Sequence, residues 1–286
     1  MAKSPKKPAA AFFDVDNTLV RGSTSYQFGK AAYKRKFFPR KDFIAFAWHQ
    51  VRFIARGETE HMLAAIKDRA LELVKGRSYE QMKALIATVY DEEIKSKVWP
   101  ETAKLAQQHV AAGREVWLIT AAPQEMGEEI AKRLGLTGAL GTKLVNIDGI
   151  LTGEIEGKPL HGKEKAKALK KLAKERGFSL KKSFAYSDSH NDLPLLSMVG
   201  HPVAVNPDKL LKIYAKSAGW KIYDFKRKDL RAVKKSVKEE IKIGSYGKIV
   251  IVTVYETSSA RANNGALMRR DRTKKQRETV IKEPTK

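Results

Sequence analysis

Residues 9–18 read AAAFFDVDNT, so that five apolar positions run directly into two carboxylates, Asp14 and Asp16. The apolar run predicts a buried strand over residues 9–15. Aspartate and asparagine are common turn residues, so the acid pair alone is also typical of a turn or a helix cap. Two carboxylates at the end of a strand equally suit nucleophilic attack and the binding of a hard cation such as Mg²⁺.

Short apolar runs alternate with helical patterns over residues 9–225. This alternation predicts an α/β protein with a Rossmann-like parallel sheet and helices on both faces. Further strands are predicted over residues 115–120, 183–187 and 203–205, and LVNIDGILTGEI (144–155) predicts a β-hairpin that turns at Asp148 and Gly149. Because ligands bind at the carboxyl ends of parallel strands, we expect the chemistry at that edge.

A helical module interrupts the alternation. Between residues 22 and 100 there is no good strand pattern, whereas FIAFAWHQVRFIARG and EHMLAAIKDRALELVKG have strong helical periodicity. We therefore predict a catalytic core over 1–22 plus 100–225 and an inserted helical cap over 23–99. Placed after the first strand, the cap would overhang the site as a lid. A basic extension, partly disordered, follows over 226–286.

Charge and composition exclude several classes of protein. The chain has 286 residues and a formal net charge of +24, of which residues 226–286 carry +11. The absence of cysteine excludes disulfides, thiolate metal sites and a cysteine nucleophile. The longest apolar-leaning run, residues 43–55, is too short to span a bilayer, so no transmembrane segment is predicted. The acids after Phe13 interrupt any secretory apolar run, which predicts a cytoplasmic protein.

Three further motifs follow predicted strands or open helices. LITAAP (118–123) places Thr120 at a strand end before a helix start, where a hydroxyl and backbone N–H groups suit phosphate. HGK (161–163) brings Lys163 to the start of a helix, although the six lysines of residues 163–176 also fit a solvated face. YSDSHNDLPLL (186–196) adds a second acid pair, Asp188 and Asp192. Four acids are thus predicted to converge on a site for a metal ion.

In order and spacing, DVDNT, LIT, Lys163 and SDSHND resemble the four motifs of the haloacid dehalogenase superfamily of phosphohydrolases. The motif set spans roughly residues 12–206. The helical insertion resembles the cap of the phosphoserine phosphatase-like branch, and YSDSHNDLPLL with PVAVNPD is similar to its bacterial subfamily IB. Ser187 departs from the pattern, because phosphoserine phosphatases usually have glycine before this aspartate.

The resemblance implies a role for each matching residue. Asp14 would be the nucleophile that forms an aspartyl-phosphate, and Asp16 the general acid and base. Lys163 would be the cation that screens nucleophile and phosphate, although Lys158 and Lys165 are close enough in sequence to compete.

The remaining roles concern phosphate and metal. Thr120 and the Ala121 N–H would bind the phosphoryl group, and Mg²⁺ would lie between the Asp14 and Asp188 carboxylates and the Asp16 carbonyl. Asp192 would orient the lysine from near the metal. The predicted cofactor is therefore Mg²⁺.

The resulting functional prediction is a phosphomonoester hydrolase for a small phosphorylated metabolite, with phosphoserine as the leading substrate. One alternative is a phosphorylated lipid, because residues 28–53 mix seven basic side chains with aromatic ones. Another is a protein that chiefly binds nucleic acid or an anionic membrane surface through the basic cap and tail. The same aromatic residues could instead form the core of the cap. The sequence leaves the oligomeric state open.

Overall fold

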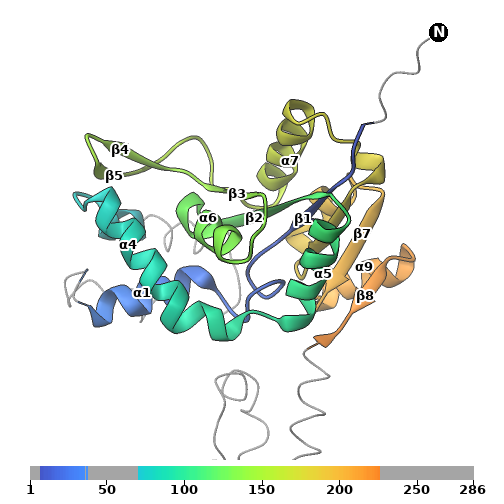
Figure 1. The fold of residues 1–286 in the computed structure, drawn as a ribbon, viewed down its shortest axis with the longest axis horizontal. Coiled ribbons are helices and arrows are strands. Elements are labelled where there is room, and N and C mark those ends of the chain that lie inside the picture. Colours follow the sequence, from blue (N-terminus) through green and yellow to red (C-terminus); the bar gives the residue numbers. More distant parts are fainter. Residues whose placement is uncertain (1–6, 36, 38–69, 226–286) are drawn as a thin grey trace, which may run out of the picture. The chain divides into compact units, whose positions relative to one another are not determined.

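The computed structural model describes residues 7–35, 37 and 70–225, and the chain divides into two units, Met1–Tyr223 and Asp224–Lys286. A six-stranded parallel sheet lies at the centre of the first unit (Figure 1), in the order β3-β2-β1-β6-β7-β8. Its strands are β1 (Ala10–Phe13), β2 (Glu115–Pro123), β3 (Gly138–Thr142), β6 (Phe184–Ser187), β7 (His201–Val205) and β8 (Lys221–Tyr223). The predicted Rossmann-like α/β fold is confirmed.

Helices cover both faces of this sheet. Helices α5 (Pro100–Ala111) and α6 (Gln124–Arg133) pack on strands β1 to β3. The opposite face carries α7 (Lys163–Glu175), α8 (Leu193–Leu196) and α9 (Lys209–Ser217). Between that face and its helices lies an apolar core that includes Phe12, Leu169 and Leu211, all fully buried. The helices packed on both faces therefore hold the edge of the sheet in a defined position.

Two strands were not predicted from the sequence. Strand β3 reads GALGT, which has no aromatic residue and only one β-branched residue, Thr142, at its end, and β8 has only three residues. Both strands pair with longer neighbours, β2 and β7, which define their register. Strand β2 also extends beyond the predicted residue 120 to Pro123, with an irregularity in its pairing to β3 after Ile119.

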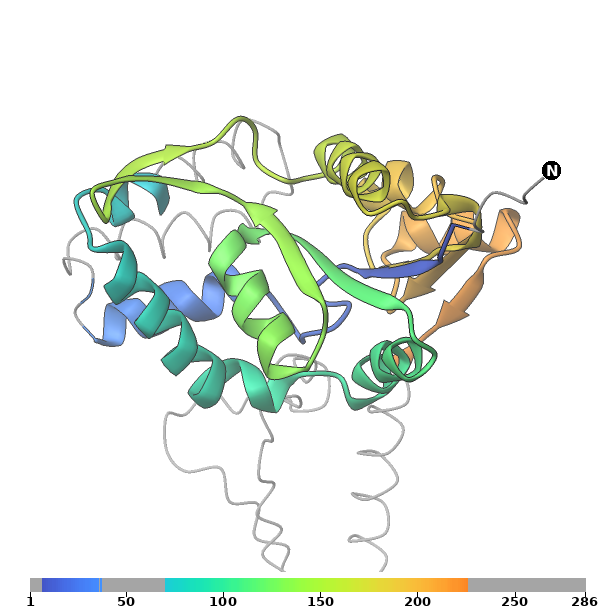
Figure 2. The ribbon, with the colours of Figure 1, turned by 45° about the horizontal axis from the view of Figure 1, so that its top comes forward.

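The predicted hairpin is present as β4 (Leu144–Ile147) and β5 (Ile150–Ile155), which pair antiparallel. Asp148 and Gly149 both have positive φ, 49° and 77°, as a two-residue type I′ turn requires. The hairpin bonds to the start of α4, where the Tyr79 N–H donates to the Gly149 carbonyl at 2.8 Å. Figure 2 shows the hairpin beside α4.

Helical structure dominates the described part of the predicted cap. It contains α1 (Thr24–Lys34), α4 (Tyr79–Val89), a π-helical turn (Tyr90–Ile94) and a 3₁₀ turn (Lys95–Lys97). The segment FIAFAWHQVRFIARG, most of EHMLAAIKDRALELVKG and most of the basic–aromatic stretch 28–53 lie outside the described residues, as does the extension 226–286. The domain boundaries and the lid therefore stay predictions.

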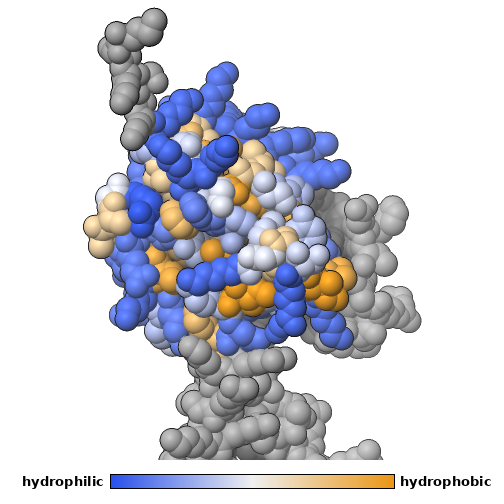
Figure 3. Space-filling view, turned by 90° about the vertical axis from the view of Figure 1, so that its right-hand side faces the viewer, coloured by the Kyte–Doolittle hydropathy of each residue, from blue (hydrophilic) through white to orange (hydrophobic). Residues whose placement is uncertain are grey.

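The surface that carries β7, β8 and α9 is largely hydrophilic (Figure 3), which agrees with the high net charge. Apolar side chains interrupt it, and on α9 the exposed ones are Leu210, Ile213 and Tyr214, at 57%, 67% and 43% exposure. Within the described part of the chain, no helix is both long and apolar enough to cross a lipid bilayer. The cytoplasmic location stays a prediction.

Candidate active site

Asp14 lies directly beyond the end of β1, at the carboxyl edge of the sheet. Its N–H donates to the Tyr186 carbonyl at 2.9 Å, so the backbone remains attached to β6 at this point. The chain then turns sharply, because the N–H groups of Leu19 and Val20 both donate to the Val15 carbonyl. Asp14 is only 8% exposed as a result. A carboxylate in such a position needs charged or polar partners nearby.

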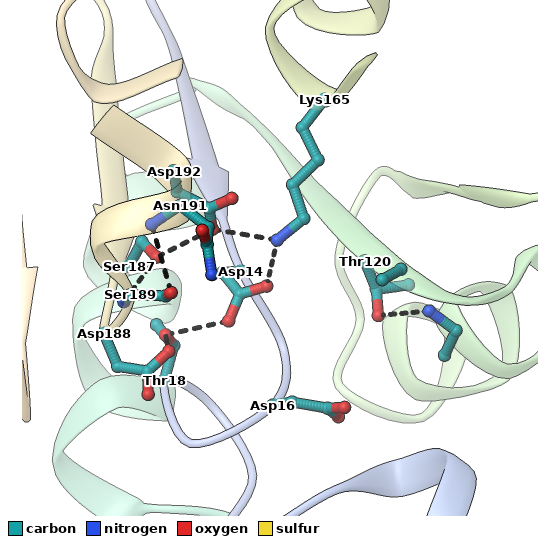
Figure 4. A network of polar contacts seen from close by, with 12 residues as sticks. Asp14, Asp16, Thr18, Thr120, Lys165, Ser187, Asp188, Ser189, Asn191 and Asp192 are labelled. Atoms are coloured by element: carbon teal, nitrogen blue, oxygen red, sulfur yellow. Dashed lines mark hydrogen bonds and ion pairs between the residues drawn. The ribbon is translucent and has the colours of Figure 1, made fainter. Parts of the chain in front are cut away.

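The cation at Asp14 is Lys165, which corrects the expectation of Lys163. The Lys165 Nζ lies 2.6 Å from Asp14 Oδ1 and 2.8 Å from Asp192 Oδ2, and all three residues are buried (Figure 4). Lys163 is exposed at the first position of α7. Two residues correspond to about 200° around a helix, so the two lysines point to nearly opposite sides.

A sequence signal for Lys165 exists. The buried positions of α7 are Lys165, Ala166, Leu169, Leu172 and Ala173, which follow the i, i+4, i+7 spacing of a core-facing stripe. A lysine on that stripe needs a buried acid as its partner, whereas Lys163 lies off the stripe. The helix starts after Gly162, whose φ of +52° is a conformation that favours glycine.

Opposing electrostatic effects act on this ion pair. Burial raises the pKa of Asp14 to about 6, even though the Lys165 ammonium favours the charged carboxylate. Burial alone would lower the pKa of Lys165, but Asp14 and Asp192 outweigh it and raise the pKa above its ordinary value. Lys165 therefore stays positively charged, and the pKa of Asp14 lies closer to neutral pH than that of an ordinary aspartate.

Asp188 approaches Asp14 from the loop after β6. The Thr18 hydroxyl lies 3.0 Å from Asp14 Oδ2 and 3.4 Å from Asp188 Oδ1, so both carboxylates meet at one hydroxyl. Asp14, Asp188 and Asp192 bring three carboxylates to this edge against the single ammonium of Lys165. In the described residues, no three His, Cys, Asp or Glu side chains form a metal cage by themselves. The excess negative charge suits a cation held by two carboxylates, carbonyl oxygen and water.

Asp16 does not join this cluster through its side chain. Its Oδ1 accepts hydrogen bonds from the Thr24 N–H at 2.9 Å and the Thr24 hydroxyl at 2.7 Å. In Figure 4 the carboxylate extends away from Asp14. Burial raises the pKa of Asp16, and the bonds from Thr24 oppose that rise. The carboxylate thus contacts the first residue of α1, at the start of the predicted cap.

Thr120 lies on the other side of Asp14 from the Asp188 loop (Figure 4). Its side chain is almost fully buried, and its hydroxyl oxygen accepts the Ala122 N–H at 3.1 Å. The hydroxyl proton is therefore available for another acceptor. Ala121 is exposed, and its carbonyl accepts a hydrogen bond from the Thr142 hydroxyl at 2.8 Å. The predicted helix start lies slightly later, at Gln124.

Several residues of the site were missed by the sequence reasoning. Thr18, Thr24 and Ser187 contact Asp14, Asp16 and Asp192 respectively, and Asp208 braces the Asp188 loop through His190. A backbone hydrogen bond also joins Asp208 to this loop, because the Asp208 N–H donates to the Asp188 carbonyl at 2.8 Å. Serine, threonine and aspartate are common at turns and caps, so only Thr18 in the first motif and Ser187 in the fourth carried a signal.

Buried acids and a lysine ammonium at the carboxyl edge of a parallel α/β sheet are typical of one class of hydrolases. The sequence profile of the haloacid dehalogenase-like hydrolases matches residues 11–197. The chain belongs to this family, and it is a phosphatase of the phosphoserine phosphatase-like kind, as its motifs predicted.

Named relatives and a solved structure agree with this placement. The chain is 46% identical over 240 residues to phosphoserine phosphatase SerB1 of Mycobacterium tuberculosis (strain ATCC 25618 / H37Rv), which covers 84% of this chain and 78% of that one. It is 31% identical over 220 residues to a histidinol-phosphatase of Neisseria meningitidis serogroup C, covering 76% and 98%. A crystal structure of a Bordetella pertussis protein of unknown function has a TM-score of 0.67 at 27% identity, with coverage of 77% and 99%.

Proposed function

We propose that the chain is a Mg²⁺-dependent phosphomonoester hydrolase that acts through an aspartyl-phosphate at Asp14. The observation that supports this most is the buried ion-pair arrangement, in which Lys165 lies 2.6 Å from Asp14 and 2.8 Å from Asp192. A nucleophilic carboxylate must approach a negatively charged phosphoryl group, and an adjacent ammonium reduces that repulsion. The exposed Lys163 is not part of this proposal.

The reaction divides between two carboxylates. Asp14 attacks phosphorus through a carboxylate oxygen, the bond between phosphorus and the ester oxygen breaks, and Asp16 gives its proton to the departing alcohol. Asp16 then takes a proton from water, whose oxygen attacks phosphorus and releases inorganic phosphate from Asp14. Burial raises the pKa of Asp16, which favours the protonated form that the first step requires. The Thr120 hydroxyl and the backbone beside Ala121 would bind phosphoryl oxygens.

The residues at the site fit a magnesium ion. Asp14 and Asp188 supply hard oxygen ligands that already meet at the Thr18 hydroxyl, and Mg²⁺ commonly uses one or two carboxylates and several waters. The Asp16 carbonyl would complete the protein ligands. When bound, the ion would neutralise charge on the phosphoryl oxygens.

The substrate proposal is a small phosphorylated metabolite, with phosphoserine first. The name of the Mycobacterium tuberculosis relative supports phosphoserine, and the name of the Neisseria relative makes histidinol phosphate the second compound to test. A phosphorylated lipid stays an alternative whose motivation, the stretch 28–53, lies mostly outside the described residues. The same holds for membrane or nucleic-acid binding through cap and tail.

Phosphate release from a panel of monoesters tests the proposal. The panel contains phosphoserine, histidinol phosphate, sugar phosphates, nucleotides and lysophosphatidate, each with Mg²⁺ and with a chelator. We expect Mg²⁺-dependent turnover that falls at least about 1,000-fold in Asp14→Asn, because the amide is a poor nucleophile. Asp148→Asn is the matched control, since it makes the same chemical change at an exposed hairpin turn.

Two results would contradict the proposal. The first is turnover that Asp14→Asn leaves intact, which would place the chemistry elsewhere. The second is the absence of turnover on the whole panel together with tight, salt-sensitive binding of nucleic acid or anionic vesicles that survives Asp14→Asn. That combination would favour the binding function instead.

A further inference from the structure

Ser187, the last residue of β6, is fully buried and its hydroxyl is hydrogen-bonded in two directions. It lies 2.7 Å from Asp192 Oδ2 and 3.2 Å from the Ser189 N–H. A backbone N–H can only donate, so the serine oxygen accepts that bond and its own proton points to Asp192. The orientation of the hydroxyl is therefore fixed by its neighbours.

These two bonds connect the two functional parts of the site. Asp192 Oδ2 also accepts a bond from Lys165 Nζ, which in turn lies 2.6 Å from Asp14 Oδ1. Ser189 is the residue directly after Asp188, one of the two proposed carboxylate ligands of the metal. One hydroxyl thus bridges the loop that presents Asp188 and the carboxylate that orients Lys165 (Figure 4).

We propose that Ser187 is a positioning residue for phosphoryl transfer, which sets the place of Lys165 relative to Asp14 and of Asp188 relative to the metal. This inference rests on the proposed function. Ser187 touches neither phosphate nor metal and acts through Asp192 and the Ser189 backbone.

Loss of the hydroxyl has a definite physical consequence. Of the donors that the described residues offer to Asp192 Oδ2, only Lys165 would remain, so this buried oxygen would draw the ammonium away from Asp14. The Ser189 N–H would lose its acceptor, which loosens the backbone beside Asp188. Groups that orient catalytic or metal-binding side chains typically change activity or metal affinity by about 10- to 100-fold when removed.

Ser183 offers a matched control on the same strand segment. It too is fully buried, and its hydroxyl also bonds in two directions, accepting the Ala10 N–H at 3.0 Å and donating to the Ser179 carbonyl at 2.8 Å. It lies just before the other end of β6, away from the acids. Ser183→Ala removes the same chemical group at the same depth, so it should disturb the fold as much as Ser187→Ala but leave the site intact.

The test compares these two variants by phosphate release and by Mg²⁺ titration calorimetry. For Ser187→Ala we expect kcat to fall about 10- to 100-fold with KM within about threefold, and Mg²⁺ affinity to fall about 10-fold. For Ser183→Ala we expect both quantities within about twofold of the parent, at a similar loss in Tm. Ser187→Cys, which keeps a weak donor, should give an intermediate kcat.

A double-mutant cycle tests the route of the effect. In the Asp192→Asn background, Ser187→Ala should cost much less in kcat than it does in the parent, because both changes interrupt the same connection. Equal losses of kcat and Mg²⁺ affinity in Ser187→Ala and Ser183→Ala would overturn the inference while leaving the phosphatase in place. Absence of turnover in the parent would instead contradict the proposed function, and the calorimetry would still decide whether Ser187 supports the metal site.

Discussion

Two adjacent residues of β6, Tyr186 and Ser187, belong to two buried polar clusters of opposite character. Ser187 bonds to the charged cluster of Asp14, Lys165 and Asp192. Tyr186 bonds to a second cluster on the other face of the sheet, where its hydroxyl lies 2.7 Å from His109 Nε2. Successive strand residues point to opposite faces, so a single strand end serves both.

In the cluster around His109, hydrogen-bond donors face hydrogen-bond acceptors. The Arg114 Nε–H donates to His109 Nδ1 at 2.7 Å, so the imidazole is neutral and its Nε2–H donates to the Tyr186 hydroxyl. Burial, together with the nearby Arg114 charge, lowers the pKa of His109 to about 4. The ring of Tyr186 stacks on Phe13, with centroids 4.1 Å apart.

The difference between the clusters is one of charge balance. In the charged cluster, acids outnumber the single ammonium, and burial raises the pKa of Asp14 to about 6. Burial of an excess of carboxylates costs folding free energy, and such a cluster is typical of a functional site. In the His109 cluster, hydrogen bonds join Arg114, His109 and Tyr186 without a buried excess of acid, and we expect this cluster to serve packing. We expect substitutions in the first to change catalysis and those in the second to change stability.

The largest expected effect is at Lys165. Lys165→Met should reduce kcat about 100- to 1,000-fold, because the nucleophile then meets the phosphoryl charge without a cation. Lys163→Met changes an exposed side chain two positions earlier and should stay within about twofold. Phosphate-release kinetics would check both, with circular dichroism to confirm the fold. A larger loss at Lys163 than at Lys165 would reverse the assignment.

The His109 cluster should make the fold sensitive to acid. The unfolded chain binds a proton on His109 near pH 6.5, whereas the folded chain keeps His109 neutral until about pH 4. Stability therefore falls as the pH drops through this window, by up to about 3 kcal/mol from this group. Urea unfolding at pH 7.5, 6 and 5 should show a steeper loss in the parent than in His109→Gln. Equal slopes would show that His109 does not titrate in this way.

A smaller effect is expected at Thr24, which bonds to Asp16 at the start of α1. Thr24→Val keeps the shape of this buried residue but removes the hydroxyl donor at 2.7 Å. Loss of one hydrogen bond to a carboxylate should lower kcat about 10-fold. In the plot of kcat against pH, the apparent pKa of the catalytic acid should move to a higher value, because the hydrogen bonds from Thr24 oppose the rise in the pKa of Asp16. An unchanged pH profile would show that the Thr24 hydroxyl, at the start of α1, does not affect the pKa of Asp16.

The smallest effect is expected at Tyr186. Tyr186→Phe removes the hydroxyl that accepts the His109 bond but keeps the ring stacked on Phe13. The free energy of unfolding should fall by about 1 kcal/mol, the net value of one buried hydrogen bond. The kcat should not change. A drop in kcat comparable to that of Ser187→Ala would show that the two clusters are not independent.

Much of the fold could be predicted because its signals are local. The apolar run before Asp14 indicated β1, and Asp148 with Gly149 indicated the hairpin turn, since each depends on neighbours in sequence. Strand β3 could not be predicted in this way. Its sequence GALGT has little strand propensity, and it forms because β2 offers an unpaired edge.

The same distinction between local sequence signals and long-range packing applies to the candidate site. Residue type and order along the chain were enough to identify the family, the sheet and the acids Asp14, Asp16, Asp188 and Asp192. The folded chain was needed to find the ion pair of Lys165 with Asp14, the contact of Thr24 with Asp16, and the hydrogen bond of Ser187 to Asp192. These contacts depend on which face of a helix or strand meets a segment far away in sequence, and that is determined by packing.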